Sequence, residues 1–72
     1  MMTLIERAAL LSLLPKMKKI DSMQCAKMWY QEFREHKDWH EFASYLDELH
    51  TKGLLRIVKP GGFVQYALIT AP

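Results

Sequence analysis

The sequence predicts one α+β domain, a three-helix bundle followed by a C-terminal two-stranded β-hairpin. Three observations support this prediction. Apolar residues recur at helical spacing in three segments before Gly53. After Gly53 the segments become rich in β-branched and aromatic residues, with Pro60-Gly61-Gly62 between two of them. With 72 residues, half of them hydrophobic, the chain has room for a single domain with a dense core.

The first helix is expected from Thr3 to Leu14. Thr3 and Glu6 have the capping-box spacing, in which each side chain accepts a hydrogen bond from a free backbone N–H. Pro15 sets the end of the helix, because the residue before a proline avoids helical angles. One apolar stripe is expected to face inward: Leu4, Ile5, Ala8, Leu11 and Ser12. Three further leucines exceed what a three-helix core covers, and form either an interface or a patch under the hairpin or C-terminal tail: Leu10, Leu13 and Leu14.

The second helix is expected from Ser22 to Arg34, after a basic connector. Asp21 or Ser22 is a suitable N-cap. Cys25 flanks the inward stripe, while Met28 points away from it and is available to a partner. The predicted inward stripe comprises Ala26, Trp29, Tyr30 and Phe33.

The third helix is expected from Trp39 to Lys52, after a polar turn over residues 35–38. Asp38 is its predicted N-cap, Glu41 stands at the capping-box position, and Gly53 supplies a left-handed C-terminal cap. The predicted inward stripe comprises Trp39, Phe42, Ala43, Leu46 and Leu49.

The hairpin is expected to pair residues 54–59 with residues 63–70. Pro60 presets the first turn angle, and the two glycines accept positive ones. Val64, Tyr66 and Leu68 alternate and should face the helices, because an isolated hairpin is marginal in water.

Composition excludes several functional classes. Cys25 is the single cysteine, so no internal disulfide forms, and we expect a reducing, cytoplasmic location. No run approaches the roughly 18 apolar residues that span a bilayer, so no membrane partner is expected. The turn separates His36 from His40, and no glycine-rich phosphate loop opens a helix. We therefore expect neither a metal nor another cofactor, and a chain this small is expected to be non-enzymatic.

Two segments resemble winged helix-turn-helix proteins. Residues 45–55 read as leucine, two polar residues, leucine, three more residues, glycine and then an apolar strand, like the end of the recognition helix in that family. The tail Tyr66-Ala67-Leu68-Ile69-Thr70 resembles the second strand of the wing. The resemblance covers residues 20–70, although the turn before the third helix is longer and the third helix more acidic than is usual.

This resemblance implies a small transcriptional regulator that binds double-stranded DNA, of a size that suits a stand-alone bacterial or phage protein. The third helix would enter the major groove and the wing would contact the backbone. By position, the recognition face comprises Lys37, His40, Glu41, Ser44 and Tyr45. The wing and connector contacts comprise Arg56, Lys59, Gly61, Gly62, Lys16, Lys18 and Lys19. A homodimer through the first helix would match the two-fold symmetry of paired half-sites.

The acidity of the third helix supports an alternative function. Carboxylates near phosphate are repulsive, and four of them lie on or beside this helix: Asp38, Glu41, Asp47 and Glu48. The alternative is a protein-interaction module or adaptor on the same scaffold. It would use the acidic third helix, the apolar first helix and Met28 as contact surfaces.

Overall fold

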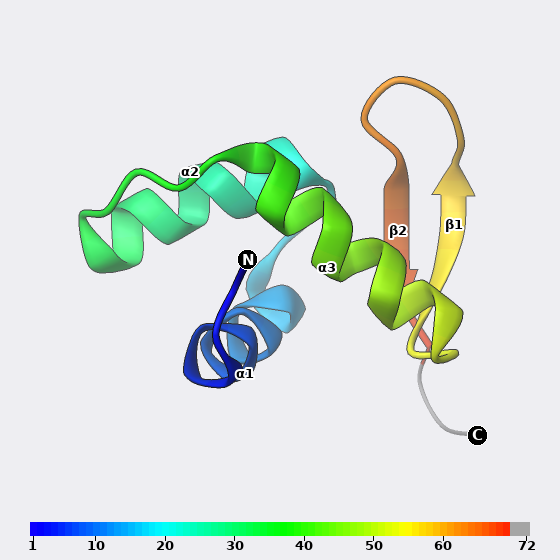
Figure 1. The fold of residues 1–72 in the computed structure, drawn as a ribbon. Coiled ribbons are helices and arrows are strands. Elements are labelled where there is room, and N and C mark those ends of the chain that lie inside the picture. Colours follow the sequence, from blue (N-terminus) through cyan, green and yellow to red (C-terminus); the bar gives the residue numbers. More distant parts are fainter. Residues whose placement is uncertain (70–72) are drawn as a thin grey trace.

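The computed structural model describes residues 1–69 (Figure 1). Its elements are α1 (Leu4–Leu13), the 3-10 turn η1 (Leu14–Lys16), α2 (Ser22–Phe33), α3 (Trp39–Thr51), β1 (Leu55–Lys59) and β2 (Gln65–Leu68). Helix α3 packs against both α2 and β1, and α1 packs against α2. Three helices followed by an antiparallel hairpin confirm the α+β prediction. Thr70, predicted as the end of the second strand, lies outside the described residues.

The predicted capping box begins α1. The Thr3 hydroxyl accepts a hydrogen bond from the Glu6 N–H at 3.1 Å, and the Glu6 carboxylate accepts one from the Thr3 N–H at 2.8 Å. The helix ends at Leu13, one residue earlier than predicted, and the chain tightens into η1 at Pro15. Both helix limits therefore follow from residues adjacent in sequence.

The predicted inward face of α1 is wrong. Leu10 is fully buried, and Leu13 and Leu14 join it in the core. By contrast, 81% of Leu4 and 84% of Ile5 are exposed. The remaining members of the predicted stripe are exposed as well: Ala8, Leu11 and Ser12. Both sets of residues have helical spacing, so periodicity alone could not decide which one the rest of the chain covers. The three leucines are therefore not available as an interface.

Helix α2 begins at Ser22 as predicted, but the side of the helix that faces the core differs from the predicted one. Asp21 is the N-cap and accepts a hydrogen bond from the Gln24 N–H at 2.8 Å. Cys25 and Trp29 are buried, whereas the predicted core residues Tyr30 and Phe33 are partly exposed. Their exposure follows from the position of α3, which packs on the side of α2 that carries Cys25 and Trp29. Ala26, predicted to face the core, and Met28, predicted to point away from it, are both half-buried against the core.

Figure 1 shows the chain after α2 running back along that helix before α3 starts. Asp38 caps α3, but it accepts from the His40 N–H at 3.0 Å and Glu41 completes no capping box. At the other end, Gly53 has φ +83° and the Leu54 N–H donates to the Leu49 carbonyl at 2.9 Å. This Schellman-type cap confirms the role predicted for Gly53.

Helix α3 supplies the centre of the core. Phe42 and Leu46 are fully buried, and Leu49 is nearly so, as predicted. The other two predicted core residues lie nearer the hairpin: Ala43 is half-buried, and Trp39 remains partly exposed with its ring centroid 5.0 Å from that of Phe63.

The hairpin carries a β-bulge. Its register pairs Leu55 with Leu68, Arg56 with Ala67, Ile57 with Tyr66 and Lys59 with Gln65, so Val58 is the extra residue. The strands are shorter than predicted, because the loop continues through Val64. Gly61 and Gly62 have φ of +86° and +57°.

The connector before α2 adds a single bridge to the hairpin. The Tyr66 N–H donates to the Ile20 carbonyl at 2.8 Å, on the edge of β2 that β1 does not use. Ile20, Leu55 and Tyr66 are buried together against the helices. The end of the connector, with Lys19 directly before Ile20, is therefore held beside the hairpin, an arrangement that the sequence did not predict.

Candidate nucleic-acid interface

Four of the five residues predicted to form a recognition face on α3 line one cavity of about 290 Å³, and Lys37 is the exception: the four are His40, Glu41, Ser44 and Tyr45. His40 and Ser44 are exposed, as that role requires. Tyr45 is only 8% exposed and lies under Arg7, whose guanidinium carbon is 5.5 Å from the ring centroid. This burial raises the pKa of the Tyr45 hydroxyl. Tyr45 is therefore part of the core and not a surface aromatic, because α1 covers that side of α3.

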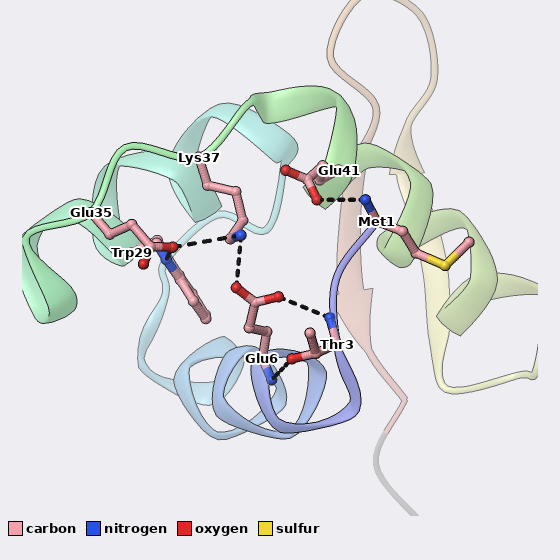
Figure 2. Close-up of polar contacts among 7 residues, drawn as sticks. All are labelled: Met1, Thr3, Glu6, Trp29, Glu35, Lys37 and Glu41. Atoms are coloured by element: carbon pink, nitrogen blue, oxygen red, sulfur yellow. Dashed lines mark hydrogen bonds and ion pairs between the residues drawn. The ribbon is translucent and has the colours of Figure 1, made fainter.

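Lys37 is also withdrawn from the predicted surface. Its side chain is 12% exposed, with Nζ 2.7 Å from one oxygen of Glu6 and 3.5 Å from one oxygen of Glu35 (Figure 2). The hydrogen bond between Lys37 and Glu6 raises the pKa of the lysine and lowers that of the carboxylate. Lys37 thus links the segment before α3 to α1, and it is not a free phosphate contact.

Internal partners neutralise most of the acidic residues of α3. Glu41 binds the Met1 amino group at 3.0 Å, and Glu48 lies 3.2 Å from both Arg7 and Lys52 (Figure 2 shows the first pair). Asp38 caps the helix and lies 2.7 Å from Nδ1 of His40. The hydrogen bonds from His40 lower the pKa of Asp38. Among residues 1–69, Asp47 is the one α3 carboxylate without such a partner.

The cations that form no ion pair differ in number from the carboxylates that form none. Of the ten lysines and arginines, Arg7, Lys37 and Lys52 form ion pairs within the described chain. The seven others form none there: Lys16, Lys18, Lys19, Lys27, Arg34, Arg56 and Lys59. On the acidic side, four carboxylates have no lysine, arginine or amino-group partner within residues 1–69: Asp21, Glu32, Asp38 and Asp47. Two of them, Asp21 and Asp38, cap helices. The unpaired cations therefore outnumber the unpaired carboxylates.

Four of these free cations surround one groove of about 440 Å³. Lys16, Lys18 and Lys19 of the connector and Lys27 of α2 line it, together with Gln24, Gln31, Met17 and Met28. The α2 residues in this group recur three or four positions apart and lie away from Cys25 and Trp29, so the groove is on the outer side of α2. Met28, predicted to be an exposed contact, is half-buried and contributes to this groove.

The hairpin residues predicted to contact DNA are on the surface. Arg56, Lys59, Gly61 and Gly62 are all exposed. Neither cation forms an ion pair within residues 1–69. The structure therefore leaves the hairpin and connector groups accessible, while Lys37 is withdrawn from the face predicted on α3 and Tyr45 is largely buried beneath it.

Other chemistry finds little support in the described part of the chain. Burial raises the pKa of the Cys25 thiol to about 12, so this thiol is a poor nucleophile. No group of three metal-binding side chains occurs within residues 1–69. None of the helices there has the length and apolar character needed to cross a bilayer.

Comparison of the chain with protein-family models, with curated proteins and with solved structures finds no match. Its function must therefore be argued from the geometry and charge described above.

Proposed function

We propose that this chain is a small DNA-binding protein of winged-helix type that acts as a transcriptional regulator. The order of three helices and a hairpin supports this assignment, as does the bridge from Ile20 to the edge of β2. The observation that carries it is the unequal number of unpaired charges, because within the described chain seven of the lysines and arginines form no ion pair, whereas four of the eight carboxylates do.

Internal pairing removes the main objection to DNA binding. A carboxylate beside a phosphate is costly only while its charge is uncompensated. Glu41 and Glu48 already bind cationic groups, and Asp38 already accepts hydrogen bonds. The acidic composition of α3 therefore overstates how strongly this helix repels a phosphate backbone.

The test is the affinity for a random DNA duplex across a salt series. Each phosphate neutralised by a lysine or arginine contributes about −0.9 to the slope of log affinity against log salt concentration. Contacts from four to six free cations thus predict a slope of roughly −4 to −5. Fluorescence anisotropy between about 50 and 200 mM salt measures this slope. Affinity that is absent at the lowest salt, or insensitive to salt, contradicts the proposal.

A second candidate function, protein interaction, is favoured by the exposed side of α1. Leu4 and Ile5 are more than four-fifths exposed, and Leu11 continues the stripe. Because the small Ala8 lies at its centre, two α1 helices can pack closely in antiparallel order, with Ile5 of one copy beside Leu11 of the other. The partner that this stripe fits is thus a second copy of the chain.

Sedimentation velocity tests this second candidate. The wild-type chain should shift from monomer to dimer as its concentration rises to about 0.5 mM, because association depends on mass action. Ile5→Glu should remain monomeric, while Lys52→Glu serves as a control outside the stripe. A wild-type chain that stays monomeric at the highest concentration rejects this candidate and leaves the DNA proposal unaffected.

A further inference from the structure

We infer that duplex DNA docks on the outer face of the hairpin and the adjoining connector, and not on α3. This inference rests on the proposed function and specifies the surface that performs it.

A hairpin cation and a connector cation lie on either side of β2. Ile20 pairs with Tyr66, and both side chains are buried on the face toward the helices. Ala67, the chain neighbour of Tyr66, therefore points to the opposite, outer face, and Arg56 pairs with Ala67 and shares that face. Lys19 is exposed and directly precedes Ile20, so it lies beside the other edge of β2, in a bend of the connector.

The β-bulge adds a second cation to the outer face of the hairpin. Gln65 precedes the buried Tyr66 and so points outward, and its partner across the bulge is Lys59. The extra residue Val58 restores the outward direction of Lys59, which simple alternation after Arg56 would have turned inward. Ala67 between Lys19 and Arg56 is small, so a phosphate backbone can approach the sheet without displacing a bulky side chain.

Lys19 joins this hairpin face to the groove beside α2. It directly precedes the bridge residue Ile20 and also lines the groove with Lys16, Lys18 and Lys27. We call the continuous surface formed by Lys16, Lys18, Lys19, Lys27, Arg56 and Lys59 the basic face.

The basic face is nearly free of carboxylates. Residues 7–20 and 49–69 contain no aspartate or glutamate. Asp21, at its border, is half-buried, and its side chain accepts a hydrogen bond from the Gln24 N–H at the start of α2. A phosphate backbone on this surface would therefore meet six cations and, at its border, one half-buried carboxylate.

The exposed side of α3 differs from the basic face in its charged residues. Its exposed residues recur at helical spacing: His40, Ser44, Asp47 and Thr51. This stripe contains no lysine or arginine and includes the one α3 carboxylate that lacks a partner within the described residues. Lys52 at the end of α3 pairs with Glu48. Phosphate contacts would therefore be few if this helix entered the major groove.

Two double variants test the inference. Lys19→Gln/Arg56→Gln removes two charges from the basic face, and Arg34→Gln/Lys52→Gln removes one lysine and one arginine charge from elsewhere. A third variant, Ser44→Glu, adds negative charge at the middle of the exposed side of α3. Thermal unfolding followed by circular dichroism verifies that each variant is folded.

The first double variant should lose about tenfold or more in duplex affinity at 100 mM salt, and its salt slope should become shallower by about 1.8. The control double variant and Ser44→Glu should each lose less than about threefold. Equal losses in both double variants, or a larger loss for Ser44→Glu, overturn the docking surface while DNA binding itself stands. A wild-type chain that prefers polyglutamate to duplex, or binds no duplex at low salt, overturns the proposed function as well.

Discussion

Two leucine-to-alanine substitutions on the same helix test which side of α1 lies in the core. Leu10 is fully buried, and 81% of Leu4 is exposed. We predict that Leu10→Ala strongly destabilises the fold and that Leu4→Ala hardly changes its free energy of unfolding. The chemical change is identical in both variants, so the difference between them reports the environment of each side chain.

The expected magnitudes follow from burial. Truncating leucine to alanine removes three carbons, worth about 2.4 kcal/mol of transfer free energy at ~0.8 kcal/mol per methylene. The cavity left at Leu10 adds to this loss, within the range of about 2–5 kcal/mol seen for buried leucines. A chain of this length has roughly 4–11 kcal/mol of total stability, so the loss is a large fraction of it. At Leu4 no cavity forms, and the change should stay within about 0.5 kcal/mol.

Urea unfolding, followed by circular dichroism and by the fluorescence of the two tryptophans, measures both free energies. Leu10→Ala should move the midpoint to markedly lower urea, and Leu4→Ala should leave it nearly unchanged. Equal losses in the two variants, or a larger loss at Leu4, would refute the reasoning, because they would place the Leu4 side of α1 in the core.

Three further predictions concern a cap, an ion pair and a thiol. Gly53→Val should lower the free energy of unfolding by about 1–2 kcal/mol, because φ is +83° at this position. No atom lies within 4 Å of an added Cβ, so the loss comes from backbone strain and not from a clash. An unchanged melting temperature would contradict this prediction. The pKa of Glu6 is lowered by its hydrogen bond with Lys37, so its stabilising effect is present above the ordinary carboxyl pKa and is lost as the pH falls through the lowered value. Glu6→Gln should therefore flatten the fall in stability seen on acidification, and an identical pH profile in urea titrations argues against the pair. With the pKa of its thiol at about 12, Cys25 should react with a disulfide reagent at pH 8 only when the chain opens; labelling as fast in the native as in the unfolded protein would show that the thiol is accessible.

The features that the sequence predicted well depend on near neighbours in the chain. Thr3 with Glu6, Asp21 and Gly53 each satisfy backbone groups within a few residues, so the helix limits are readable from local chemistry. The hairpin is readable for the same reason, since its proline and glycines select the turn. Exposure of the connector and hairpin cations also follows locally, because such charges stay in water unless something pairs with them.

Contacts between distant segments decided which charges are paired and which side of α1 is buried. Arg7 meets Glu48 across 41 positions, and Lys37 reaches Glu6 in another helix, so no local pattern indicates which charges are neutralised. The choice between the two apolar sides of α1 has the same cause, because each side repeats with helical spacing and only the packed neighbours distinguish them. Sequence alone therefore determined the elements, and the limits of the helices to within one residue. Tertiary packing determined which faces are buried and which charges remain free, since burial and ion pairing depend on residues that only folding brings together.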